Sequence, residues 1–138
     1  MRIIVIDDER TFKTRSLIEH IGAFADGSDL VTHVRNSHDG LATIARAITD
    51  YAVAYGEEIV LFLDHDLGGD DDIRRVVDFL CVVRPQGIYS IYIHSQNPVS
   101  EDLVQVLKRA GFFRTEKIGL PELSVVQSNT ATNQTIKV

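Results

Sequence analysis

The sequence lacks the features that mark secreted, fibrous and membrane-spanning chains. Its 138 residues include one cysteine, Cys81, so no disulfide can form within the chain and a cytoplasmic location is expected. No apolar run approaches the roughly 18 residues that a transmembrane helix needs. The apolar run after Met1 is short and ends in acids, so no signal peptide is expected. With 44% hydrophobic and 25% charged residues, the composition is that of a globular protein.

The sequence also lacks an excess of positive charge. Lysine and arginine number 14 against 20 aspartates and glutamates, which gives a net charge of −6, and the basic residues form no cluster. Proteins that bind nucleic acid or anionic lipid through phosphates need the opposite balance. We therefore expect no DNA-binding motif and no membrane partner.

Short apolar runs alternate with longer segments of helical periodicity, which is typical of an α/β fold with a parallel sheet and helices on both faces. The polar segment 127–138 is expected to be a loose tail on a single domain, 1–126. No internal repeat or linker suggests a second domain. Strands are expected at 2–7, 30–35, 58–64 and 88–94, with a possible fifth at 112–118, and helices at 11–27, 36–56, 72–84 and 97–111.

Polar and acidic residues follow three of the expected strands. Asp7 and Asp8 follow the first strand, Asp64 to Asp66 end the third, and His94 to Asn97 end the fourth. The carboxyl ends of parallel strands meet at one edge of a sheet, so these side chains should lie close together. Crowded carboxylates repel one another unless a cation binds, and Mg²⁺ prefers such oxygen ligands. The candidate metal ligands are Asp7, Asp8, Asp64 and Asp66.

Each of these acids also has a simpler interpretation. A single aspartate after a strand is more often a helix cap or a turn residue than a ligand. The run Asp70–Asp72 stands at a helix start, where negative charge favours the helix dipole, and is interpreted as a solvated cap. The pattern of a double acid after one strand and an acid after another is more specific than any single residue.

Three motifs, "IIVIDDER", "FLDHDLGG" and "IYIHSQNP", resemble the receiver domain of two-component response regulators over about residues 1–118. The resemblance implies a receiver-like (flavodoxin-like) three-layer sandwich with a parallel sheet of four to five strands. It implies that Asp7 and Asp8 bind Mg²⁺ and that Asp64 accepts a phosphoryl group. It further implies that Ser95 contacts the phosphoryl oxygens.

Other residues depart from ordinary receivers. Lys117 lies near the place of the receiver lysine, but the usual Lys-Pro pair is absent. His65 and Asp66 after the acceptor, and His94 before the serine, are similar to a divergent branch found in bacteria and phages, the cyclic-phosphate-processing receivers. That branch combines "DD-x-R", which here ends in Arg10, with "DHDLG" and "HS-x-NP".

The leading hypothesis is Mg²⁺-dependent phosphate chemistry on a cyclic phosphate or a nucleotide end. Asp64 could attack phosphorus, and Arg10 could stabilise the developing charge. His65 or His94 could transfer a proton, because histidine titrates near neutral pH. The candidate catalytic residues are Asp64, His65, Ser95, His94 and Arg10.

Two non-enzymatic hypotheses remain open. The chain could be a stand-alone receiver that is phosphorylated on Asp64 and binds a partner protein. It could also be an interaction or decoy protein whose acidic edge is the contact surface. The expected partner is accordingly a small phosphate-containing ligand or a protein.

Overall fold

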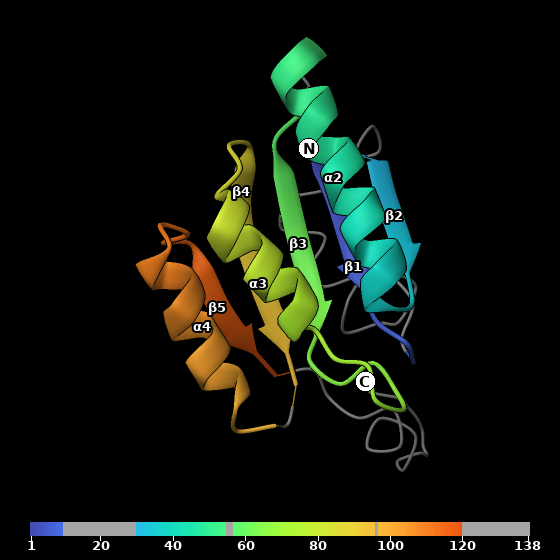
Figure 1. The fold of residues 1–138 in the computed structure, drawn as a ribbon, viewed down its shortest axis with the longest axis vertical. Coiled ribbons are helices and arrows are strands. Elements are labelled where there is room, and N and C mark those ends of the chain that lie inside the picture. Colours follow the sequence, from blue (N-terminus) through green and yellow to red (C-terminus); the bar gives the residue numbers. More distant parts are fainter. Residues whose placement is uncertain (10–29, 55–56, 96, 120–138) are drawn as a thin grey trace, which may run out of the picture.

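A five-stranded parallel sheet with three helices on one face makes up the described part of the chain (Figure 1). The computed structural model describes residues 1–9, 30–54, 57–95 and 97–119. The expected helix at 11–27 and the tail at 127–138 lie outside these residues. The strands are β1 (Arg2–Ile6), β2 (Leu30–Val34), β3 (Ile59–Asp64), β4 (Ile88–His94) and β5 (Thr115–Ile118), and the helices are α2 (Ser37–Ala54), α3 (Arg74–Val83) and α4 (Ser100–Arg109).

The strand order is β2-β1-β3-β4-β5, with every pair parallel. The chain moves outward from β1 to β2 and then crosses to β3 on the other side of β1, so the order reverses between β1 and β3. The predicted α/β fold with a parallel sheet is confirmed, and the fifth strand is present. Among the described helices, none is long and apolar enough to span a membrane.

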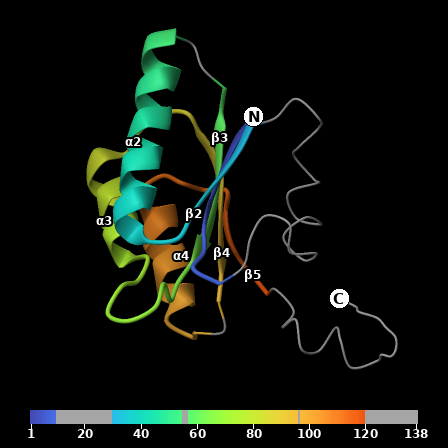
Figure 2. The same cartoon turned by 90° about the vertical axis from the view of Figure 1, so that its right-hand side faces the viewer.

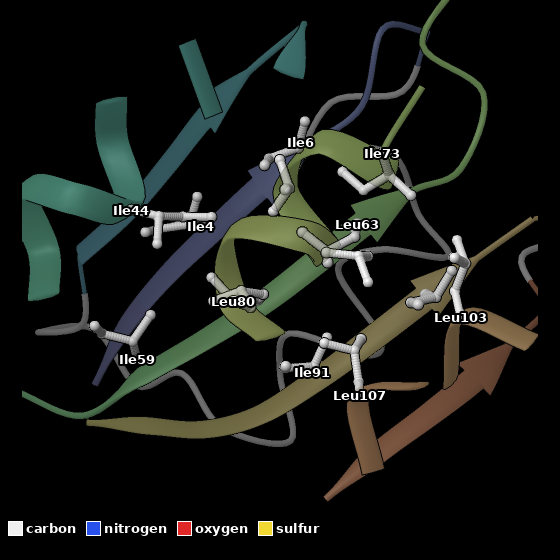
Figure 3. Packing of buried hydrophobic residues seen from close by; sticks show 14 of the residues in the cluster. Ile4, Ile6, Ile44, Ile59, Leu63, Ile73, Leu80, Ile91, Leu103 and Leu107 are labelled. Atoms are coloured by element: carbon white, nitrogen blue, oxygen red, sulfur yellow. The ribbon is translucent and has the colours of Figure 1, made fainter. Parts of the chain in front are cut away.

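The sheet separates two clusters of buried apolar side chains. Ile4, Ile6 and Leu63 pack under α2, α3 and α4, as Figure 3 shows from close by. Val5 and Phe62 belong to the second cluster, on the opposite face. Figure 2 shows the sheet nearly edge-on, with the three helices on one side. All six residues of β3 are buried, as expected of a central strand.

Two element boundaries differ most from the expected ones. The helix expected from 97 begins at Ser100, because Asn97 Oδ1 accepts the Val99 N–H at 3.0 Å and 97–99 form a tighter turn. The strand expected over 112–118 is shorter, because the Phe112 N–H bonds to the Leu107 carbonyl at 3.0 Å. Local hydrogen bonds at the two ends of α4 therefore hold residues 97–99 and Phe112 in turns, although the apolar pattern had predicted a helix and a strand there.

The loop between β3 and α3 is fastened to the start of α2. Asp71 accepts hydrogen bonds from the Ser37 N–H at 2.9 Å and from Ser37 Oγ at 2.6 Å. Partial burial alone would raise the pKa of Asp71, but these hydrogen bonds outweigh it and the pKa lies below its ordinary value. The predicted solvated cap is thus wrong for Asp71, which caps a different helix from the one that follows it. Asp72 does serve its own helix, since its Oδ1 accepts the Arg74 N–H at 2.8 Å.

We expect Asp71→Ala to lower the free energy of unfolding by about 1–2 kcal/mol at neutral pH, because two helix-end hydrogen bonds are lost. The folded-state pKa of Asp71 is lowered, so the difference should be full above the unfolded-state pKa of about 3.9 and shrink as pH falls through the lower folded-state value. Urea unfolding across this pH range measures it. Asp70→Ala, at an exposed neighbouring acid, is the control, and equal losses in both variants would contradict the prediction.

Candidate active site

One row of residues crosses the whole sheet at the carboxyl ends of its strands. Asp64 pairs with His94, which pairs with Ile118. Asp7 and Arg35 directly follow the last paired residues of β1 and β2, so they continue the row. Side chains in one row of a parallel sheet point to the same face. The row therefore brings two acids and a histidine together from β1, β3 and β4, and Arg35 stands next to it at the end of β2.

Three carboxylates meet at this edge. Oxygen atoms of Asp7, Asp8 and Asp64 all lie within 4.8 Å of one another. Asp7 is fully buried and Asp64 nearly so, whereas Asp8 is half-buried. Asp7 Oδ1 accepts the Glu9 N–H at 2.9 Å. Ionised carboxylates this close repel one another, and a hard divalent cation such as Mg²⁺ fits a donor set made only of oxygens.

The fourth expected metal ligand, Asp66, is not in this group. Its side chain is exposed, and its backbone forms an antiparallel bridge with Asp72 in the β3–α3 loop. The residue lies two positions beyond the end of β3, where the chain has already turned away from the sheet edge. The structure thus brings together three of the four predicted ligands.

Two residues of the neighbouring strand hold the backbone of the acidic pair. His33 Nε2 donates to the Asp7 carbonyl at 2.8 Å, and an Arg35 guanidinium N–H donates to the Asp8 carbonyl at 2.8 Å. The sequence assigned neither residue a role. Their spacing of two at the end of a strand places both on one face, but only the pairing of β2 with β1 brings them to the acids.

The two predicted catalytic histidines have different surroundings. His94 is buried, and its Nε2 lies 3.7 Å from Asp7 Oδ2, within ion-pair distance when the imidazole is protonated. His65 is also buried, and its Nδ1 shares a hydrogen bond of 2.7 Å with Ser100 Oγ at the start of α4. His94 thus contacts the acid cluster, whereas His65 links the β3–α3 loop to a helix.

The remaining predicted site residues are placed unevenly. Ser95 follows the β4 end at the same edge as Asp64, and its Oγ accepts the Asn97 N–H at 2.9 Å. Arg10 lies outside the described residues. Lys117 aligns with Ile93, one residue before the row, so it faces the opposite side of the sheet and forms no ion pair with any described residue.

Gly68 brings the β3–α3 loop against the acid cluster. Its φ of +89° lies in the region that favours glycine, and a Cβ at this position would stand 3.0 Å from Asp8 Oδ2. The adjacent Gly69 also has a positive φ, +57°, but a Cβ there would meet no atom within 4 Å. Only the first glycine of the pair therefore makes room for a site carboxylate.

Comparison with known proteins identifies one family. The model of the cyclic-phosphate processing receiver domain matches residues 2–110, which span β1 to α4. The match ends before β5, the strand on which the receiver lysine is expected. The family match confirms the predicted resemblance to the cyclic-phosphate-processing receivers. No curated protein and no solved structure matches the chain significantly.

We predict that Gly68→Ala weakens divalent-cation binding while Gly69→Ala does not. Both variants force a side chain into a positive φ, at a cost of about 1 kcal/mol in stability, but only the first places a methyl group against the Asp8 carboxylate. The measurement is the rise of melting temperature with added Mg²⁺ for each variant. Equal rises would show that Gly68 has no part in placing Asp8.

Proposed function

Because the chain belongs to the cyclic-phosphate processing receiver domain family, we propose that it performs Mg²⁺-dependent phosphate chemistry on cyclic phosphates. The observation that carries the proposal is the meeting of three carboxylates with a buried histidine at one sheet edge. Neither group alone suggests more than a binding site. Together they offer a cation site and a group that can transfer a proton.

Asp7, Asp8 and Asp64 would hold the cation, which when bound supplies positive charge to the phosphate oxygens. Opening a cyclic phosphate by hydrolysis forms one bond from a water oxygen to phosphorus and breaks one ester P–O bond. The attacking water loses a proton, and the leaving alkoxide oxygen gains one. Phosphoryl transfer asks a protein chiefly to position these groups and stabilise their charge.

His94 is the better placed of the two histidines for the proton transfer. Its Nε2 lies 3.7 Å from Asp7 Oδ2, which places the imidazole beside the acid cluster. His65 instead has its Nδ1 committed to Ser100 in the interior. In this proposal His94 is the general acid or base, His65 supports the fold, and Ser95 and Arg10 bind the phosphate.

We expect Mg²⁺ at millimolar concentration to raise the melting temperature of the protein. A ligand that binds only the folded state stabilises it by about 2.7 kcal/mol at a hundredfold excess over its dissociation constant. Asp8→Asn should abolish the rise and leave the metal-free protein as stable or more so, because it relieves repulsion among the three acids. Asp66→Asn, at an exposed acid outside the cluster, should behave like wild type. A melting temperature that does not respond to Mg²⁺ or Mn²⁺ would refute the metal site.

We expect turnover of 2′,3′- or 3′,5′-cyclic nucleotides with Mg²⁺, and His94→Gln should lower it by about 10²–10⁴-fold, the usual contribution of a positioned acid or base. His65→Gln should lower the melting temperature but keep turnover within a few-fold, since its contact is with Ser100. Product release from each cyclic nucleotide gives the rates. Absence of turnover in wild type, together with stable phosphorylation of Asp64, would instead favour the stand-alone receiver.

A further inference from the structure

Arg35 is a cationic side chain at the carboxyl edge of the sheet, and no carboxylate of the described residues pairs with it. It follows β2 and continues the row that contains Asp7, Asp64 and His94. Its guanidinium donates one hydrogen bond, to the Asp8 carbonyl, and forms no ion pair with a described residue. The side chain is exposed.

This arrangement differs from that of the other described arginines near acids. Arg2 pairs with Asp50 at 2.8 Å, and Arg74 lies 3.9 Å from Asp72, so each has a carboxylate partner. Arg35 instead contacts a backbone oxygen, the Asp8 carbonyl, and forms no ion pair with a described residue. A guanidinium has five N–H donors, so one bond to a carbonyl fixes its position and leaves a fork for another acceptor.

We propose that Arg35 is a phosphate-binding residue, which contacts the non-bridging oxygens of the substrate phosphate beside the acid cluster. The proposal rests on the proposed function for the identity of the substrate, but not for the presence of an anion site. Guanidinium groups bind phosphate through two parallel hydrogen bonds, and anchoring on Asp8 reduces the side-chain freedom lost on binding. Arg35 would hold the phosphate from the β2 side, while His94 approaches from the β4 side.

A purely structural role for Arg35 makes a different prediction. If Arg35 only held the Asp8 carbonyl in place, its loss would weaken phosphate binding only by weakening Mg²⁺ binding. Loss of His33, which bonds to the adjacent Asp7 carbonyl, should then have the same effect. His33→Gln is therefore the matched control. It loosens the same backbone segment and leaves the exposed guanidinium in place.

The experiment measures binding of inorganic phosphate by titration calorimetry, with and without saturating Mg²⁺, and the Mg²⁺-induced rise in melting temperature. We expect Arg35→Gln to weaken phosphate binding at saturating Mg²⁺ about ten- to a hundredfold, the range for a lost hydrogen bond to a charged group, while its Mg²⁺ response falls no further than that of His33→Gln. The phosphate affinity of Arg35→Lys should lie between those of wild type and Arg35→Gln, because lysine keeps the positive charge but cannot form two parallel hydrogen bonds. His33→Gln should keep wild-type phosphate affinity at saturating Mg²⁺.

Several outcomes would overturn the proposal. These are wild-type phosphate affinity in Arg35→Gln, no phosphate binding by wild type in either condition, or parallel losses of metal and phosphate binding in Arg35→Gln and His33→Gln. If wild type shows no Mg²⁺ response but binds phosphate in a manner that depends on Arg35, the metal-dependent function fails and the anion site stands. If the Mg²⁺ response is present and Arg35→Gln binds phosphate normally, only the role of Arg35 fails.

Discussion

The in-register parallel pairing of β1, β3 and β4 is the constraint on which the candidate site depends. β3 lies between the other two strands and pairs with both without a shift near its carboxyl end. Asp7 and His94 come from strands that do not touch, yet the alignment brings their side chains to 3.7 Å across the end of β3. A slip of one residue in either pairing would turn one of these side chains to the opposite face of the sheet.

The same alignment requires charge to be buried. Asp7 is fully buried and Asp64 almost so, and isolated carboxylates are unstable in such surroundings. Local groups reduce this cost at Asp7, where the Glu9 N–H and the His94 ring both approach the carboxylate. The pairing of the strands therefore holds the three carboxylates together although they repel one another. Such locally unfavourable arrangements are common at functional sites.

Sequence patterns predicted the fold and three of the acids that cluster at the sheet edge, because both follow from local order along the chain. Apolar runs indicated the strands, and acids at their ends indicated the edge of the sheet where the carboxylates meet. Residues whose place depends on pairing between strands could not be predicted in this way. Neighbouring residues of a strand point to opposite faces, and only the register of β4 with β3 shows that His94, rather than Ser95, shares a row with Asp64. His33 and Arg35 needed the position of β2 beside β1, and Asp71 needed the position of α2 beside the β3–α3 loop.

The β3–α3 loop contacts two distant parts of the molecule within four residues. Gly68 lies against the Asp8 carboxylate, and its carbonyl accepts the Asp71 N–H at 3.0 Å. The Asp71 carboxylate in turn accepts the Ser37 N–H of α2. The short turn between them leaves little slack. A ligand that shifts the Asp8 carboxylate would therefore strain the Asp71 contact, so the rate at which the Ser37 amide hydrogen exchanges with solvent reports the state of the site from the first turn of a helix outside it.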